Sequence, residues 1–521
     1  MPNLPEPYTM RDWQAVARQF DALAFDFERR GEFLPLIWWD RSHTNLERDT
    51  FGLYSYVGDA RQGSGSSHEA ITCIGAVLGA TLSGIDKSAQ NGYNWVEMLE
   101  AYFNTANGQN LVLNGTSAKT GGSFWYELYP QILYDQLAFA YPHMERLTEI
   151  VLVTADRWRE AVELMKDGTG IPDFDYTAFN FAKMRPVRNG SWREPDAAAA
   201  VAWIQYMAWT KSGNTAYLDT ADDCMAFLEA FPRNPLYEVL LPYGAYLAAR
   251  MSAELGRSYD LSRLLNACFD GSDVRREWGV IVGRWGDLDA HGLVGLRSTW
   301  DAYAFAMNTF AFAGALAPIP RYAAQYARAI GKWLLNLSNA ARLFYSDALP
   351  PEQQTCAFWQ DDPHHVIAYE ALRQRQGDYS PYAMGDPLIH GWAQTDFGLY
   401  GSCQVGVLGG LLASTSIESI LRINLLATDT FHDRAYPTYL YYNPHTSPKP
   451  IELSLGPEPI DLYDAVSHSW LVHRAVDTAR ITIPPDQAVI LVLVPSGARL
   501  RRQDTRLLAD TVIIDYWSAE R

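Results

Sequence analysis

The chain has 521 residues, 48% of them hydrophobic, and its 42 basic and 60 acidic residues give a formal net charge of −18. This length and hydrophobic content allow a large buried core. The acidic balance excludes the basic surface that nucleic acids require and disfavours polyanionic ligands, so we expect no nucleic-acid partner.

The cysteines and the termini carry few functional signals. Five widely spaced cysteines include no CxxC pair and no histidine at ligand spacing, so we expect no metal and no cofactor. The N-terminal segment lacks the basic start and apolar run of a signal peptide, and no apolar stretch is long enough to cross a bilayer. We therefore expect no membrane partner, with a cytoplasmic location as the sequence stands and a secreted or periplasmic one if a leader was removed. The oligomeric state is not predicted.

Helical periodicity begins near the N-terminus and continues almost to residue 430. Over residues 9–30 apolar residues recur at helical spacing, and Gly31 stands where a C-terminal cap belongs. Further helices are predicted over residues 66–82, 92–104, 123–140, 144–166, 194–212, 216–230, 236–255, 300–316, 320–345 and 362–375.

The predicted helices are of two kinds. Residues 70–84, 240–253 and 302–317 are apolar or small nearly all round, as is typical of helices enclosed on every side. Residues 148–168 and 320–344 carry a charged face that favours contact with solvent. Alternation of buried and half-exposed helices predicts an inner ring and an outer ring, which together make an α/α toroid.

The composition changes near residue 432. Short β-branched and aromatic runs follow, separated by turns rich in proline and glycine, at residues 436–443, 451–455, 479–483, 488–495 and 511–517. We therefore predict a mainly α protein, with an (α/α)6-type toroid over residues 1–431 and a small antiparallel β-sandwich over residues 432–521.

Carboxylates recur at the starts of the buried helices, each after a loop rich in glycine, serine or asparagine. They are Glu69, Glu127, Glu194, Asp196, Glu238, Asp301 and Asp396. One such acid is explained by helix capping, because a carboxylate complements the helix dipole. In a toroid, however, the N-termini of the inner helices converge at one end, so these acids are expected to surround one cleft. Glycoside hydrolysis needs such a pair of carboxylates.

Four acids are predicted to be catalytic. Glu194 and Asp196 flank a proline in SWREPD, and two acids at one helix start exceed what capping needs. Glu69 is the first choice of partner because the adjacent His68 would tune its ionisation. Asp287, in VGRWGDLDAHG, comes next.

Aromatic and polar loop residues are predicted to bind the substrate, because flat rings match the apolar faces of sugars. They are Trp38, Trp39, Asp40, Arg41, His68, Trp125, Tyr126, Glu127, Tyr176, Trp192, Arg284, Trp285, Trp300 and Asp301. For PLIWWDRSHTN two alternatives stay open, an exposed sugar subsite or a buried tryptophan pair with an Asp40–Arg41 bridge. WQDDPHH lacks a third ligand at metal spacing, so a capped helix start at Asp361 or Asp362 explains it better.

The alternating helices and the tail YYNPHTSPKPIELSLG…IDLYDAVSHSWL resemble the bacterial six-hairpin, or α/α-toroid, carbohydrate-active enzymes. This superfamily includes inverting glycosidases and, with a following β-domain, heparinase-type polysaccharide lyases. The resemblance covers most of the chain but is architectural, and it identifies no specific family.

The resemblance implies an inverting glycosidase that acts on an oligo- or polysaccharide with one general acid and one general base. Two alternatives remain. One is a lyase that acts on a uronate by β-elimination, with Tyr126, His68, Asn94 and Arg284 as its candidate residues. The other is a non-catalytic glycan-binding relative.

Overall fold

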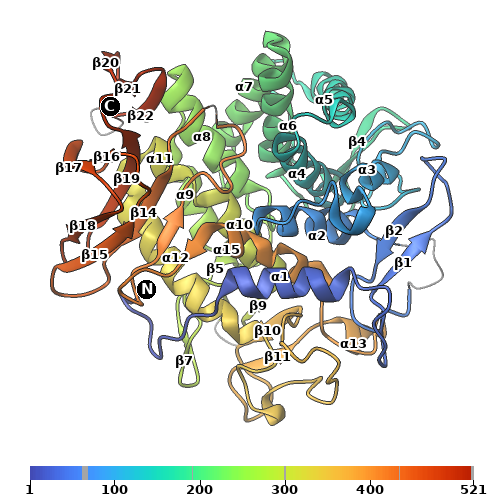
Figure 1. Ribbon diagram of the computed structural model, residues 1–521. Coiled ribbons are helices and arrows are strands. Elements are labelled where there is room, and N and C mark those ends of the chain that lie inside the picture. Colours follow the sequence, from blue (N-terminus) through green and yellow to red (C-terminus); the bar gives the residue numbers. More distant parts are fainter. Residues whose placement is uncertain (62–67, 191, 299–300, 433, 518–521) are drawn as a thin grey trace.

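The computed structural model describes residues 1–61, 68–190, 192–298, 301–432 and 434–517. Helices dominate the chain as far as α15, and strands dominate the remainder (Figure 1). The α-helices are α1 (Trp13–Ala24), α2 (Ala70–Leu82), α3 (Trp95–Met98), α4 (Phe124–Ala140), α5 (Glu145–Met165), α6 (Ala197–Ser212), α7 (Thr215–Ala230), α8 (Leu241–Leu255), α9 (Leu261–Phe269), α10 (Ala306–Leu316), α11 (Ile319–Tyr322), α12 (Ala327–Ala341), α13 (Pro387–His390), α14 (Leu399–Ser402) and α15 (Gly406–Leu411). Among the described residues, none of these helices combines the length and the apolar character that crossing a bilayer needs.

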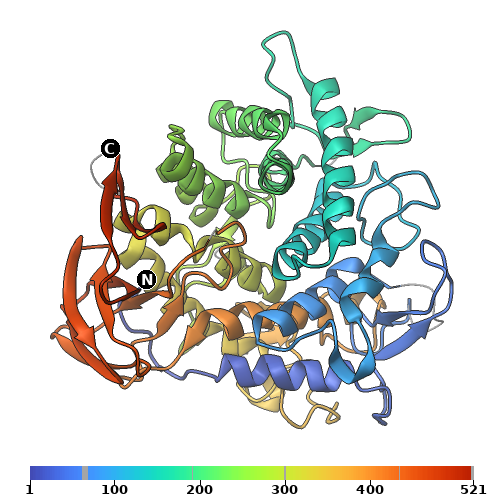
Figure 2. The same ribbon diagram turned by 45° about the horizontal axis from the view of Figure 1, so that its top comes forward.

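The buried helices form a closed circuit of contacts. Helix α2 packs on α4, α4 on α6, α6 on α8, α8 on α10, α10 on α15, and α15 back on α2. Other helices lie outside this circuit, with α1 on α15, α5 and α7 on α6, α9 on α8, and α12 on α10. Figure 2 shows the helices following one another around a common centre, with the C-terminal strands, in red, to one side.

The sequence explains which helices are enclosed. In α2, α6 and α10 small and apolar side chains occur on every face, and nearly all of their residues are buried. In α5 the buried residues recur every three or four positions, while the remaining face is charged. The burial pattern of these helices fits the two kinds that the sequence predicts. The segment 320–344 is an exception, because most residues of α12 are buried against α10 and the strands β14 (Thr438–Tyr442) and β19 (Ala488–Pro495).

Two glycines allow the circuit to close between α2 and α15. A Cβ atom added to Gly79 would lie 2.3 Å from the backbone oxygen of Cys403, and one added to Gly406 would lie 2.0 Å from the backbone oxygen of Gly79. Only glycine permits this backbone-to-backbone approach. We call this contact the α2–α15 seam.

Several predicted helices differ from the structure. Residues 362–375, all of which are described, form turns and the strand β10 rather than a helix, because Asp362 accepts hydrogen bonds from the N–H groups of Val366 and Ile367 and so holds a turn. The first helix ends with Phe25 as its C-cap, well before Gly31. Helix α9 was not predicted.

The strands form several small antiparallel sheets. They are β1 (Ile37–Asp40), β2 (Thr50–Leu53), β3 (Ala178–Asn180), β4 (Arg185–Val187), β5 (Trp278–Val280), β6 (Arg284–Trp285), β7 (Leu288–Asp289), β8 (Val294–Leu296), β9 (Tyr303–Phe305), β10 (Ala371–Arg373), β11 (Tyr382–Met384), β12 (Leu412–Ala413), β13 (Arg422–Asn424), β14 (Thr438–Tyr442), β15 (Lys449–Ser454), β16 (Ile460–Asp464), β17 (Ser469–Ala475), β18 (Thr478–Ile483), β19 (Ala488–Pro495), β20 (Leu500–Gln503), β21 (Arg506–Ala509) and β22 (Val512–Asp515). A five-stranded sheet in the order β11-β10-β9-β8-β5 lies within the part of the chain for which only helices were predicted.

The C-terminal strands pack on the helices. A six-stranded sheet has the order β12-β13-β14-β19-β16-β17, and its strands β14 and β19 contact α12. The pair β15–β18 shares a separate apolar cluster with this sheet, in which Ile451 and Ile481 join Tyr441 and Leu491. Since β12 and β13 come before residue 432, the sheet begins inside the segment predicted as helical, and the domain boundary stays a prediction.

Candidate active site

The starts of the buried helices are linked by hydrogen bonds. Glu194, just before α6, accepts a hydrogen bond from the Ser123 hydroxyl at 2.8 Å and one from the Trp125 N–H at 2.8 Å, both at the start of α4. Asp196 accepts one from the N–H of Tyr237, just before α8, at 3.0 Å. The N-terminal ends of α4, α6 and α8 therefore meet, as the sequence predicts for the inner helices.

Glu69 stands at the N-cap position of α2 without capping it. Its carboxylate instead accepts a hydrogen bond from the Asn114 amide at 3.0 Å and lies 3.5 Å from the Arg61 guanidinium. The side chain is 21% exposed. Burial raises the pKa of Glu69, and the contacts with Asn114 and Arg61 oppose this rise only in part. Glu69 is thus a partly open carboxyl group whose pKa lies above the ordinary value.

Glu238 precedes α8 and is the second partly open carboxyl group. Its side chain is 10% exposed and forms an ion pair with Arg275. Burial raises the pKa of Glu238, while Arg275 and the Trp125 side chain favour the charged form. Arg275 is itself held over the rings of Tyr237 and Trp278, at 4.8 and 5.3 Å from their centroids.

The exposed Tyr126 ring stacks on the buried Trp125 ring, and its pKa responds to both of these carboxyl groups. The rings of Trp125 and Tyr126 stack at 4.3 Å with an interplanar angle of 13°. Tyr126 is 45% exposed, and burial together with the charges of Glu69 and Glu238 raises its pKa to about 12. The charges of both carboxylates therefore reach one tyrosine hydroxyl. We call Glu69, Glu238, Trp125 and Tyr126, with Arg61 and Arg275, the Glu69–Glu238 cluster.

Glu194 and Asp196 are placed differently from the expectation. Both are 0% exposed. Besides the bonds above, Glu194 accepts one from the Trp192 indole at 2.6 Å. Burial raises the pKa of Glu194 to about 8 and that of Asp196 to about 7. Their placement supports a positioning role, in which they hold Trp125, Trp192 and Tyr237 in place, and it gives no support to their predicted catalytic role.

Glu127 is a further buried acid. It accepts hydrogen bonds from the N–H groups of Gly121, Gly122 and Phe179 at 2.6, 3.2 and 3.2 Å. Burial raises its pKa to about 8. Glu127 therefore fixes the loop before α4, and contact with substrate remains a prediction for it.

His68 turns away from Glu69. It is buried, its Nε2 atom lies 2.7 Å from Asp40, and its other ring nitrogen contacts the Tyr102 hydroxyl. Burial disfavours the charged ring, yet the hydrogen bond with Asp40 raises the pKa of His68 to about 9. The partners of Glu69 are Asn114 and Arg61, so the prediction that His68 tunes Glu69 finds no support.

The segment 35–45 does not match either alternative in full. Asp40 is paired with His68, whereas Arg41 is exposed and lies 3.4 Å from Asp49, so the expected Asp40–Arg41 bridge is wrong. The Trp38 ring packs edge-on against His68, and Trp39 stacks on Phe27 at 4.6 Å. The two tryptophans therefore do not form one subsite.

The remaining predicted residues lie apart from the Glu69–Glu238 cluster. Arg284, the buried Trp285 and the exposed Asp287 belong to the β6–β7 hairpin, which contacts the N-terminal segment through Asp289 and Glu6. Asp301 forms an exposed ion pair with Arg276 at 2.9 Å, and Tyr176 lies under the guanidinium of Arg188. Trp300 lies outside the described residues.

Sequence reasoning missed the pairing of Glu238 with Arg275 and the role of Arg61 in the cluster, and it also missed the buried acid Glu370. Glu238 was recognised as a helix-start acid but was not selected, and its pairing with Arg275 joins segments 37 residues apart. Arg61, which binds both oxygens of Asp59 at 3.1 and 2.9 Å and lies over the rings of Tyr56 and Trp392, carried no motif. Glu370 accepts a hydrogen bond from the Tyr56 hydroxyl at 2.8 Å, and burial raises its pKa to about 7.

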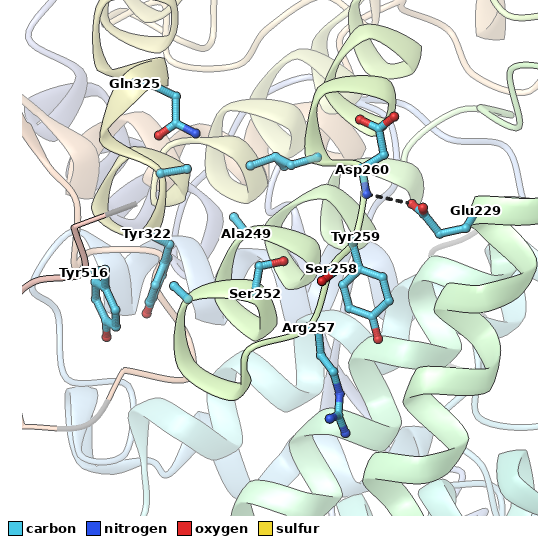
Figure 3. A pocket seen from close by; sticks show the side chains of 13 residues that line it. Glu229, Ala249, Ser252, Arg257, Ser258, Tyr259, Asp260, Tyr322, Gln325 and Tyr516 are labelled. Carbon is cyan, nitrogen blue, oxygen red and sulfur yellow. Dashed lines mark hydrogen bonds between the residues drawn. The ribbon is translucent and has the colours of Figure 1, made fainter. Parts of the chain in front are cut away.

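A cavity of about 390 Å³ lies elsewhere, near the C-terminal end of α8 (Figure 3). Its polar residues satisfy one another, because Asp222 binds both Arg257 and Tyr259, and Glu229 accepts a hydrogen bond from the N–H of Asp260 at 3.1 Å. Within the described part of the chain no three histidine, cysteine or acidic side chains are grouped as a metal site would need.

No protein-family model matches this chain, and no curated protein matches it. Among solved structures, the GH127 β-L-arabinofuranosidase Ara127N from Geobacillus stearothermophilus T6 is 12% identical over 97% of this chain and 85% of that one, with a TM-score of 0.37. A D-mannose isomerase is 11% identical over 76% of this chain and 96% of that one, with a TM-score of 0.42. A family 76 glycoside hydrolase from a bovine Bacteroides thetaiotaomicron strain is 9% identical over 77% of each chain, with a TM-score of 0.42. Glycoside hydrolases are thus among the structural neighbours, as the sequence resemblance led us to expect, and no specific family is shown.

Proposed function

We propose that this chain is a glycoside hydrolase that cleaves an oligo- or polysaccharide, with Glu69 and Glu238 as its general acid and general base. We infer an (α/α)6-type toroid over residues 1–431 and a small β-sandwich over residues 432–521. The closed circuit from α2 to α15, with outer helices around it, supports the toroid. The β15–β18 pair over the six-stranded sheet supports the sandwich.

One observation carries the proposal. Glu69, whose side chain is 21% exposed, and Glu238, whose side chain is 10% exposed, have pKa values raised by burial, and their charges both contribute to the raised pKa of the exposed Tyr126. Paired carboxyl groups with perturbed pKa values are the means by which glycosidases protonate a leaving oxygen and activate water. The exposed ring of Tyr126, which stacks on the buried Trp125, offers the apolar surface on which a sugar ring packs.

The two carboxyl groups suit different roles. Glu69 lies 3.5 Å from the Arg61 guanidinium and contacts the Asn114 amide and the Ser55 side chain, and burial raises its pKa in spite of these contacts, so we assign it as the general acid. Glu238 is in direct contact with Arg275, which favours the carboxylate, so we assign it as the general base. We expect inversion, for which the carboxyl groups stand about 6.5–9.5 Å apart and leave room for a water molecule.

The lyase alternative is less well supported. A base for β-elimination must be free to take a proton at neutral pH, and the pKa of Tyr126 is raised to about 12. His68 is enclosed between Asp40 and Tyr102. Neither residue suits that task.

The test is a screen of oligosaccharides and polysaccharides for new reducing ends, followed by NMR observation of the anomer that is released first. On any substrate found, Glu69→Gln and Glu238→Gln should each lower kcat by about 10²–10⁴-fold. Glu145→Gln, which changes an exposed acid in the first turn of α5, is the matched control and should leave kcat unchanged.

Three outcomes would contradict the proposal. Products that absorb as unsaturated uronates would indicate a lyase. Interconversion of an aldose and a ketose without bond cleavage would indicate an isomerase. Full activity in both the Glu69→Gln and Glu238→Gln variants would place the chemistry outside the Glu69–Glu238 cluster.

A further inference from the structure

A second cavity of about 710 Å³ lies along α1, between this helix, β1 and the segment that leads into α3. Its volume is within the range of about 300–1,000 Å³ that is usual for ligand pockets. It shares no lining residue with the Glu69–Glu238 cluster. We call it the Trp39 cavity.

The aromatic residues of the Trp39 cavity form a platform. The rings of Phe27, Trp39 and Trp95 are nearly parallel, with interplanar angles of 11° between Phe27 and Trp39 and 13° between Trp39 and Trp95. Tyr93 adjoins Trp39 at 5.1 Å with its ring tilted by 57°. Trp95 is buried, Phe27 and Trp39 are half-buried, and Tyr93 is 42% exposed. Flat apolar surface is thus open to a ligand on one side of the cavity.

Polar side chains line the same cavity. They are Arg18, Asp21, Asp26, Glu28, Gln90 and Asn91. The buried Lys87 forms an ion pair with Asp21 at 2.7 Å and so neutralises it. Asp26 accepts hydrogen bonds from the N–H groups of Glu28 and Arg29, and Glu28 lies 3.5 Å from Arg30. These two acids still outnumber Arg18 in the lining, which disfavours an anionic ligand. Rings for an apolar face, together with amide and charged groups for hydroxyls, suit a neutral ligand with many hydroxyl groups.

The β1 strand separates this cavity from His68. Successive side chains of a strand point to opposite faces. Trp38 packs on His68, the residue before Glu69, whereas Trp39 faces Phe27 and the cavity. The two aromatic surfaces therefore lie on opposite sides of β1.

We propose that the Trp39 cavity is a second, non-catalytic site that binds a sugar ring of a neutral oligo- or polysaccharide. This inference goes beyond the proposed hydrolysis and does not depend on it, since it is argued from the lining of a separate cavity. A site of this kind would hold a polymer chain on the protein surface while another part of the molecule acts on it.

The test is affinity electrophoresis of the full chain in native gels that contain xyloglucan, laminarin, arabinan or galactomannan. The Glu69→Gln chain serves as the parent so that turnover does not remove the ligand. Tyr93→Ala removes an exposed ring of the platform, and Ala22→Trp fills the cavity from the exposed face of α1 without removing any packed group. Each should raise the dissociation constant by at least about tenfold for the polysaccharide that retards the parent. Tyr379→Ala is the matched control, because Tyr379 is also 42% exposed, and it should migrate as the parent does.

The outcomes separate this inference from the proposed function. Retardation that survives both Tyr93→Ala and Ala22→Trp, or that is absent for every polysaccharide, overturns the Trp39 cavity as a glycan site. Retardation that only Tyr126→Ala abolishes places the binding at the Glu69–Glu238 cluster and also overturns it. Dimerisation that Tyr93→Ala abolishes in sedimentation would assign the cavity to a second copy of the chain instead. If both cavity variants lose retardation, the Trp39 cavity is supported as a glycan site. If the wild-type chain at the same time hydrolyses none of the polysaccharides, the proposed hydrolase is contradicted.

Discussion

The buried carboxyl groups at the two ends of helix α8 differ in how far neighbouring charges compensate them. Before its N-terminus, Glu238 has Arg275 as its ion-pair partner and a contact with the Trp125 side chain, and burial raises the pKa of this carboxyl group. Toward its C-terminus, Arg250 joins Arg321 around Asp429, which is fully buried. Burial there also disfavours the charge, yet the two arginines hold the pKa of Asp429 below its usual range.

The difference shows which charges are structural. Asp429 also accepts hydrogen bonds from the hydroxyls of Tyr246 and Tyr322, so its charge is fully compensated. A compensated group stays ionised at little cost in free energy, and it is not suited to act as a general acid or base. Glu69 and Glu238 are incompletely compensated, and burial raises the pKa of each above its ordinary value, which is the direction that a general acid requires. The following variants test this contrast.

The largest expected effect on stability is at the compensated end. Asp429→Asn leaves the buried Arg321 without its counter-charge and leaves Arg250 with Glu254 alone, and it should lower the free energy of unfolding by about 3–5 kcal/mol, as measured by urea denaturation. Glu69→Gln should change the same quantity by less than about 1 kcal/mol. Equal free energies of unfolding for the two variants would contradict the distinction between the compensated Asp429 and the incompletely compensated Glu69.

A smaller effect is expected from Glu194, whose carboxyl group has a pKa of about 8 when folded against an ordinary value of 4.5. Between these values the folded chain keeps a proton that the unfolded chain has released, so this contribution to stability is full below pH 4.5 and is lost as the pH rises to about 8. Glu194→Gln cannot titrate. The melting temperature of the variant, relative to that of the wild type, should therefore rise from pH 4.5 to 8. A difference that is flat with pH would show that Glu194 is not held protonated.

The smallest effect is expected at Arg275, which favours the charged form of Glu238. Arg275→Gln removes this stabilisation, so Glu238 should need a higher pH to lose its proton. The acidic limb of the pH profile of kcat/KM should move to higher pH by up to about one unit. Arg276→Gln, which affects an exposed pair with Asp301, is the control. A shift in the control variant alone, or a shift to lower pH in Arg275→Gln, would contradict the role of Glu238.

Local patterns in the sequence predicted the helices well, because burial on one face or on all faces leaves a direct periodic signal. Segments 362–375 and 278–384 were harder to predict, since short strands and turns there are held by distant partners such as the β9–β10 pairing. The site shows the same limit. Glu69 was predicted because an acid at the start of a helix can be recognised from the sequence alone. The exposure that separates Glu238 from Glu194, and the arginine that faces each acid, depend on contacts between segments and could not be predicted.

The α2–α15 seam has a consequence for the synthesis of the chain. Helix α2 leaves the ribosome more than 300 residues before Gly406 is synthesised. Until then its apolar surface is exposed to water, because the helix has no polar face. A nascent or truncated chain that stops short of residue 406 therefore exposes apolar surface that only the completed chain can bury. Folding of the helical part should be governed by the arrival of its last helix, and chaperones should be needed until that moment.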